Sequence, residues 1–277
     1  MNNIADSIWL HWHGHPYAVV GLILMQAAYL IAVGPLRNKY SLSDSIEPRH
    51  PTLFSAGILV IFVSILSPLH VLSDKYLFSA HMIQHVLLTL VAPPLLVLGT
   101  PGWLISPLLK SRFILIVSRK LTHPITAIVT FNFIFSIWHV PALYTMSVNY
   151  HNVHVGEHVL FMVSAIIMWM PIYSNIKELP RLSNPLQMIY LFVMSIAQII
   201  VFGMVTFSTE ALYNHYIEAP RLWNISPLID QQIGGIIMKV GGGGVFLTLL
   251  ITIFLKWYKS EQNTSGDYAV NGKDVFR

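Results

Sequence analysis

Cysteine is absent from the 277-residue sequence, and charged residues make up only 10% of it. The missing thiols exclude disulfide bonds, a thiol nucleophile and a thiolate metal site. Soluble domains usually carry about 25% charged residues, so the low charge excludes an ordinary soluble protein. The net charge of +4 is not accompanied by a basic run interleaved with aromatic residues. We therefore expect no nucleic-acid partner.

Several familiar functional signals are also missing. No basic segment precedes an apolar stretch at the start of the chain, so no cleavable signal peptide is predicted. The glycine run at 241–244 lacks the G-K-[ST] ending of a phosphate-binding loop, and no H-E-x-x-H motif of a metalloprotease occurs. No nucleophile, base and orienting residue stand together as hydrolysis would require. We expect a protein that is not an enzyme.

What the sequence has in abundance is apolar residues, which form 55% of the chain. Seven stretches reach the roughly 20 residues that a helix needs to cross a bilayer of about 30 Å. They lie near 17–36, 52–72, 76–98, 123–143, 152–173, 186–208 and 231–255. The expected fold is an all-α integral membrane protein, a seven-transmembrane helix bundle. A segment 1–16 precedes this domain (17–258), and a polar tail 259–277 follows it.

The distribution of Lys and Arg predicts the orientation of the bundle. Thirteen of them fall in the loops 37–51, 99–122 and 174–185 and in the tail, whereas the alternate loops hold only Lys75 and Arg221. Because cytoplasmic loops carry the excess of basic residues, the N-terminus is predicted to lie outside and the C-terminus in the cytoplasm. The predicted location is the bacterial plasma membrane, as a multi-pass protein in the lipid bilayer.

The thirteen histidines gather at one predicted membrane face. Only His50 and His123 fall near the cytoplasmic side; the other eleven fall on or near the outer side: His11, His13, His15, His70, His81, His85, His139, His151, His154, His158 and His215. An ionisable side chain at bilayer depth is costly, so such residues indicate a functional site by default. A single one is equally well explained as an interhelical hydrogen-bonding residue, the interpretation we favour for His70, His139 and His215.

Two histidine pairs at helical spacing stand out. His81 and His85 are four residues apart, so they share one face of the third predicted span, about 7 and 13 Å from its outer end. His154 and His158 do the same on the fifth span, and His139 lies near the outer end of the fourth. Imidazole is the commonest metal ligand in proteins. Without thiolates, the candidate metals are copper, zinc, iron and haem iron.

Several stretches of the chain resemble the CtaG-type family of assembly factors for caa-type cytochrome c oxidases. They are "FSAHMIQHVLLTLVAPPLLVLGTP" (78–101), "WHVPALY" (138–144), "NVHVGEHVLFM" (152–162), "WMP" (169–171) and "DQQIGGIIM" (230–238). The resemblance covers residues 50 to 255. It implies a seven-span bundle that helps the oxidase to mature, with a suspected role in supplying copper. The family's histidine positions fall on His81, His85, His154 and His158; His139 lies in a variable part of its motif.

The leading hypothesis is a non-catalytic assembly factor that binds a copper ion in an outer-leaflet chamber and passes it to the oxidase. His81, His85, His154 and His158 would be ligands, with His139 as an additional candidate. Met82 or Met162 would supply softness toward Cu(I), and Gln84 and Glu157 would orient the imidazoles from outside the ligand set. The expected partners are cytochrome c oxidase subunits and an exterior copper donor protein.

Two alternatives stay open. A haem-binding membrane electron carrier or oxidoreductase would use bis-histidine ligation across the third and fifth spans. A metal transporter would need a polar path to the cytoplasmic side, where the spans are apolar. Two features also stay open. The segment "HWHGHP" at 11–16 fits a metal-capture segment or an interfacial anchor, and Lys239 could pair with Glu157 or Asp230 or bind an anionic group.

Overall fold

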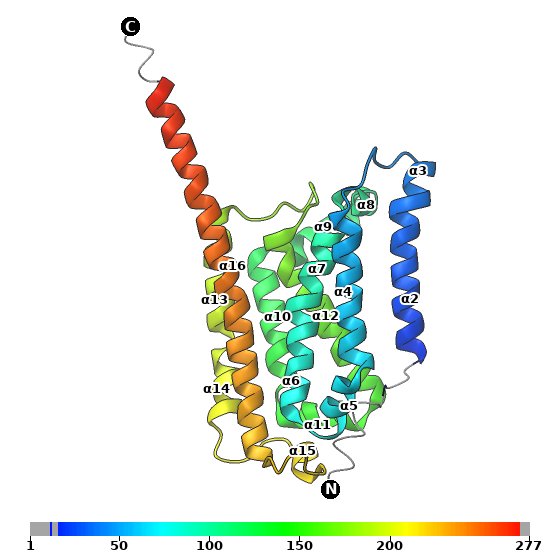
Figure 1. The fold of residues 1–277 in the computed structure, drawn as a ribbon, viewed down its shortest axis with the longest axis vertical. Helices are drawn as coiled ribbons and strands as arrows, with labels where there is room; N and C mark the ends of the chain where they lie inside the picture. Colours follow the sequence, from blue (N-terminus) through cyan, green and yellow to red (C-terminus); the bar gives the residue numbers. More distant parts are fainter. Residues whose placement is uncertain (1–11, 13–15, 272–277) are drawn as a thin grey trace.

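The computed structural model describes residue 12 and residues 16–271, and every regular element in that part of the chain is a helix. The first half forms α2 (Pro16–Ile31), η1 (Ala32–Leu36), α3 (Arg37–Lys39), α4 (Arg49–Leu66), α5 (Pro68–Lys75), α6 (Phe78–Val86), η2 (Leu87–Val91) and α7 (Ala92–Gly99). The long helices run side by side in one bundle, with both η1 and η2 being short π-helical stretches inside longer spans (Figure 1).

The second half completes this bundle. It forms α8 (Gly102–Ile105), η3 (Leu108–Lys110), α9 (Arg112–Leu121), α10 (Pro124–Trp138), α11 (Pro141–Asn149), α12 (His151–Tyr173), α13 (Asn184–Ala197), α14 (Ile199–Phe207), α15 (Asn214–Glu218) and α16 (Pro227–Asn271). Helix α16 continues without a break from the last predicted span into the predicted polar tail, and it projects beyond the bundle (Figure 1). The histidines at 11, 13 and 15 lie outside the described residues.

Six helices of the described chain are long and apolar enough to cross a membrane, and a seventh span results if the bent pair α9–α10 counts as one. The two members of that pair are bent by 68°. The expectation of a helical membrane protein is therefore confirmed, while the count of seven and the orientation stay predictions. The fourth predicted span is short because Val140 turns extended (ψ 124°) ahead of Pro141, which starts a new helix.

The second predicted span, 52–72, is divided in the structure. Helix α4 ends at Leu66, and α5 starts at Pro68 after Ser67 has turned to an extended conformation. The Ser67 side chain accepts a hydrogen bond from the backbone nitrogen of Leu69 at 3.2 Å, a cap that suits a helix with proline in its first turn. This break turns the chain so that α5 lies against α6, which carries the first histidine pair.

Of the two prolines in the third span, Pro93 leaves a backbone carbonyl that a neighbouring helix supplies with a hydrogen bond. Pro93 has no N–H, so the carbonyl of Thr89, four residues earlier, loses its helical partner. The indole nitrogen of Trp169 in α12 donates to that carbonyl at 2.9 Å. In a bilayer no water would replace the lost bond. The contact therefore joins the span with one histidine pair to the span with the other.

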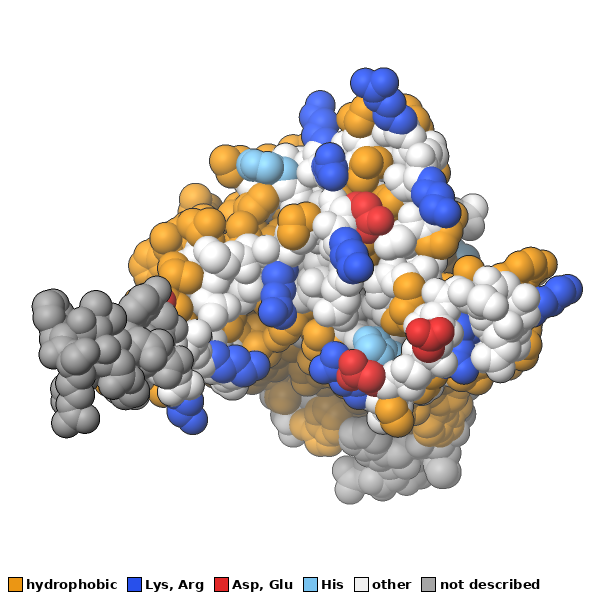
Figure 2. All heavy atoms as spheres, turned by 90° about the horizontal axis from the view of Figure 1, so that it is seen from above, with side chains coloured by type: hydrophobic (Ala, Val, Ile, Leu, Met, Phe, Trp, Pro, Cys, Tyr) orange, Lys and Arg blue, Asp and Glu red, His pale blue; other side chains and the backbone are white. Residues whose placement is uncertain are grey.

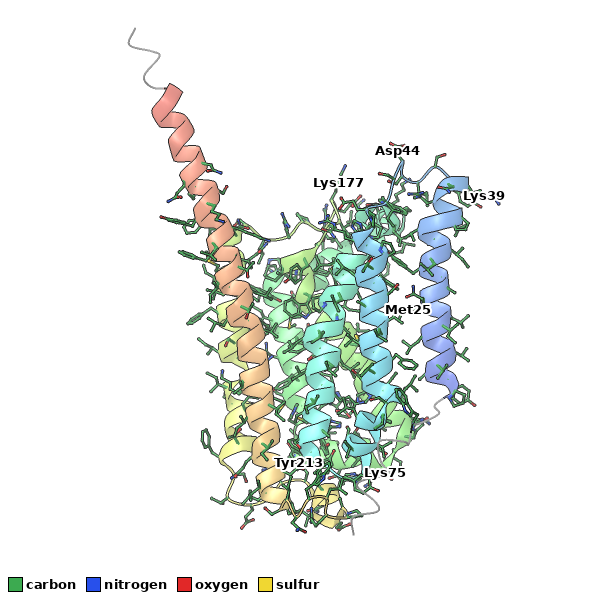
Figure 3. The ribbon with its side chains drawn as sticks, viewed as in Figure 1. Met25, Lys39, Asp44, Lys75, Lys177 and Tyr213 are labelled. Carbon is green, nitrogen blue, oxygen red and sulfur yellow. The ribbon has the colours of Figure 1, made fainter. Side chains whose placement is uncertain are left out.

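The two ends of the bundle differ in charge. Figure 2 looks onto the upper end of Figure 1 and shows more Lys and Arg than Asp and Glu side chains there. Lys39 and Lys177 lie at this end, whereas Lys75 lies at the opposite end with the short helices α5, α11 and α15 (Figures 1 and 3). The histidine-bearing start of α6 also lies at that lower end (Figure 1).

Helix α4 meets α2 and the end of α7 at two close contacts. The Tyr29 ring stacks on Phe54 with centroids 3.8 Å apart, and its hydroxyl donates to the carbonyl of Gly99 at 2.7 Å. A Cβ atom at Gly99 would lie 2.4 Å from the backbone nitrogen of Phe54. The backbones of α4 and α7 can approach this closely only because residue 99 has no side chain.

Gly99→Ala is therefore expected to destabilise the bundle by about 1–3 kcal/mol, the usual cost of overpacking against a neighbour that cannot move. The measurement is the thermal unfolding midpoint of the purified protein in detergent. Gly156→Ala is the matched control, because a Cβ there meets no atom within 4 Å. Equal midpoints for the two variants would show that α4 and α7 can separate at no cost.

Candidate metal centre

The four predicted ligands come together from α6 and α12. The ring centroids of His81 and His85 are 4.3 Å apart, and those of His154 and His158 are 4.5 Å apart, as helical spacing predicts. Between the two helices, His85 lies 5.9 Å from His158 and His81 lies 6.2 Å from His154. One compact cluster therefore contains both pairs. Whether it holds a metal ion stays a prediction.

Two more groups lie beside this cluster: His139, which follows α10, and Glu157, which lies on α12. His139, directly after α10, is buried with its ring centroid 6.2 Å from that of His85. The Oε1 atom of Glu157 lies 3.8 Å from Nε2 of His85, and the Ser147 hydroxyl donates a short hydrogen bond to Oε2. The Glu157 carboxylate thus presents one oxygen to the histidines while the other is held by Ser147.

His81, His85 and Glu157 form what we call the buried triad. Each offers one ligand atom, and these atoms all lie within 4.8 Å of one another. Ligand atoms around one metal ion are about 3.4–4.2 Å apart at bond lengths near 2.1 Å. Small side-chain rotations would therefore bring the three atoms into coordination range.

The sequence predicted Glu157 as an orienting residue because it points about 100° away from His158. The structure shows that the face of α12 directed at α6 is centred between His154 and Phe161, whose ring packs 4.6 Å from that of His85. Glu157 and His158 flank this centre on its two sides, roughly 60° and 40° from His154. Both therefore reach His85, and Glu157 is placed where a ligand would be.

A hydrogen-bond chain sets the tautomer of His81. The Gln84 amide nitrogen donates to the backbone carbonyl of Ser64 at 2.9 Å, which fixes the direction of the amide. The Gln84 oxygen accepts the hydroxyl proton of Ser73 at 2.6 Å. The Ser73 oxygen, 3.1 Å from Nδ1 of His81, is then left to accept. In neutral His81 the proton is therefore on Nδ1, and Nε2 carries a lone pair. Gln84 thus contacts His81 through Ser73, and its role in orienting a metal ligand stays a prediction.

In neutral His139 the proton is also on Nδ1, and a single backbone hydrogen bond sets this tautomer. Its Nδ1 lies 2.6 Å from the backbone carbonyl of Phe135, which can only accept, so Nδ1 carries the proton. The Nε2 atoms of His81, His85, His139 and His158 are all buried without a hydrogen-bond partner in the described structure. Buried polar atoms are nearly always paired, so four bare nitrogens in one cluster call for an explanation. A metal ion bound among them fits the donor set.

His70 belongs to the same network in a different role. Its Nδ1 lies 3.2 Å from the Gln84 amide nitrogen, which can only donate, so this ring nitrogen is an acceptor. Its ring stacks near His154 with centroids 6.1 Å apart. His215 likewise serves structure, since its Nε2 bonds the Asp74 carbonyl at 2.7 Å. The structural interpretation of both residues agrees with these contacts.

The predicted methionines pack into apolar surroundings. Met82 is fully buried in the core cluster with Phe78, and its Cγ would lie 3.1 Å from a Cβ at Gly234 in α16. Met162 packs against the cluster formed by α2, α4 and α7. No hydrogen bond joins either sulfur to a histidine among the described residues, so their ligand role stays a prediction.

Two charged residues have partners that the sequence did not indicate. Asp230, at the start of α16, accepts from the backbone nitrogens of Phe78 and Ser79 at 2.6 and 3.2 Å. It thereby caps the helix that carries His81 and His85. Lys239 donates to the carbonyl of Ser195 at 3.3 Å. Lys239 thus contacts the last turn of α13, and the predicted pairing with Glu157 or Asp230 is replaced by this contact.

A cavity of about 430 Å³ lies between α2, α4, α5 and α12. We call it the outer cavity. Apart from Tyr17, its polar lining consists of His70, Asp74, His151, His154 and His158, and the remainder is apolar. The Asp74 carboxylate lies 3.8 Å from Nδ1 of His154. Asp74 could not be predicted from residue spacing, because the turn at Ser67 is what brings it beside α12.

The model of the family described as cytochrome c oxidase caa3 assembly factor (Caa3_CtaG) matches residues 27–260. No curated protein and no solved structure matches the chain. The matched region covers most of the chain and contains every residue of the cluster. The chain therefore belongs to the family of cytochrome c oxidase caa3 assembly factors.

Proposed function

We propose that this assembly factor holds one Cu(I) ion as cargo at the buried triad and hands it to a cytochrome c oxidase subunit in the bacterial plasma membrane. The observation that carries the proposal is the set of four buried Nε2 atoms without hydrogen-bond partners around a single carboxylate. Imidazole and carboxylate ligands are compatible with several transition metals. Among these metals, copper is the one that the resemblance to the assembly-factor family implies, and an exterior donor protein would supply it.

The charge of the buried triad favours Cu(I) over a divalent ion. The buried triad contributes one carboxylate and two imidazoles whose neutral forms carry no charge. A single Glu157 carboxylate neutralises one positive charge, whereas a divalent ion would leave a net charge buried at bilayer depth. Unpaired charge in such a site is costly. Because Cu(I) also accepts two or three ligands, the site can release it by exchanging one ligand at a time.

The haem alternative has less support. A porphyrin ring would have to lie between two axial imidazoles, one from α6 and one from α12. The rings of His81, His85, His154 and His158 lie 4.3 to 6.3 Å from their neighbours in the cluster. A macrocycle inserted at one histidine pair would therefore displace the other pair.

The test is elemental analysis and an optical spectrum of detergent-purified protein after incubation with Cu(I) and removal of the excess. We expect about one copper per chain, no Soret band, and the same result in His123→Ala, a control in which an exposed histidine far from the cluster is removed. A Soret band would assign the protein to the haem class. Retention of neither copper nor haem would leave an assembly factor that works without a metal.

A further inference from the structure

The outer cavity and the buried triad differ in exposure. The Asp74 side chain is 31% exposed, whereas the Glu157 side chain is 2% exposed. Both carboxylates face histidines, with Asp74 3.8 Å from His154 and Glu157 3.8 Å from His85. The described part of the chain thus has two carboxylate–imidazole pairs, one beside an open cavity and one sealed inside. Such a pair can bind a cation only where an ion can reach it. The outer pair, beside the outer cavity, meets that condition.

A row of imidazoles joins the two pairs. From His154 the next ring is His158, with centroids 4.5 Å apart, and from His158 the next is His85 at 5.9 Å. His158 lines the outer cavity and also belongs to the cluster around the buried triad. Each ring centroid on this row lies within 6 Å of the next, so an ion that moves along it stays among imidazoles and does not cross bare hydrocarbon.

We propose that Asp74 and His154 form an outer station that captures Cu(I) from the outer cavity, and that His158 passes the ion to the buried triad. This inference rests on the proposed function. In the first transfer step a bond forms between the ion and Nε2 of His158 while the bond to the Asp74 carboxylate breaks. In the second step the ion forms bonds to the buried triad while its bonds to His154 and His158 break. The ion keeps its single charge, no electron moves, and Asp74 becomes a free carboxylate again beside the open cavity.

The outer station controls how fast the buried triad fills, but it does not hold the ion at rest. Asp74→Asn keeps the size and shape of the side chain and removes its charge. Because an anionic group at the mouth of a cavity raises the association rate of a cation by roughly 10- to 1,000-fold, we expect at least about 10-fold slower loading in this variant. The final copper content is expected to equal that of wild type.

A second variant tests the route without touching charge. Gly21 of α2 lines the outer cavity, and a Cβ atom there meets nothing within 4 Å. Gly21→Phe should therefore fill the cavity without straining the fold and slow loading by at least about 10-fold as well, since a ring would occupy the space through which the ion passes. Asp44→Asn is the matched control, because Asp44 is exposed at the opposite end of the bundle (Figure 3).

The experiment mixes detergent-purified protein with a Cu(I)–chelator complex in a stopped-flow instrument and follows the chelator colour, with the final copper content measured separately. Slow loading in Asp74→Asn and Gly21→Phe, with wild-type rates in Asp44→Asn, is the expected result. Equal rates in all four proteins would overturn the outer station and leave the proposed function intact. Lost copper content in Asp74→Asn would also overturn it, because Asp74 would then hold the resting ion. Absence of copper from wild type itself would instead refute the proposed function.

Discussion

His85→Ala is expected to lower the affinity for Cu(I) by at least about 100-fold. Loss of a residue that merely orients a ligand typically costs 10- to 100-fold in metal affinity, so loss of a ligand should cost no less. His85 occupies the centre of the site: its ring lies next to those of His81, His139 and His158, and its Nε2 faces Glu157.

The affinity is measured by competition with a chromophoric Cu(I) chelator at several chelator concentrations. Val86→Ala is the matched control, since it shortens the adjacent side chain on α6 without removing a nitrogen. The thermal midpoint of each metal-free variant separates loss of binding from loss of fold. Copper retention in His85→Ala at the wild-type level would show that His85 is not a ligand.

Glu157→Gln is the second substitution with a large expected effect. The side chain keeps its shape and can still bond the Ser147 hydroxyl, but the negative charge is gone. A monovalent ion at the buried triad would then lack a counter-charge inside the protein. Removing one partner of a buried ion pair costs about 3 kcal/mol or more. That corresponds to an affinity loss of about 100-fold.

The same chelator competition measures this loss, and Ser147→Ala provides the control that removes the neighbour of the carboxylate while keeping its charge. We expect Ser147→Ala to lose less than about 10-fold, in the lower part of the range for residues that only orient a ligand. If Glu157→Gln binds Cu(I) as tightly as wild type, the carboxylate is not a ligand and the site consists of imidazoles alone.

The sequence predicted the two histidine pairs because residues four apart share a face of any helix, whatever that helix packs against. It also predicted Gln84 as an orienting group, and the structure supplies the partners, Ser64 and Ser73. The match to one family then agrees with the resemblance seen in the motifs. These features could be predicted since they depend on local spacing within single helices.

The remaining groups depend on how helices meet, which spacing does not reveal. Glu157 was predicted only as an orienting residue, because the direction of the face toward α6 depends on packing around Phe161, which residue spacing does not reveal. Asp74 and His70 reach the site only because the chain breaks at Ser67, within a stretch predicted as one continuous span. Asp230 caps α6 from the other end of the chain, a contact that joins residues 152 positions apart.

The dispersal of the site along the chain has a consequence for biogenesis. Each span of a helical membrane protein can insert as an independent unit, and the spans associate with one another afterwards. His81 and His85 would therefore be in the bilayer before the second pair has been synthesised, and α16, whose Asp230 anchors α6, would arrive last. The proposed copper site would thus reach its final geometry only after the last helix has docked against α6.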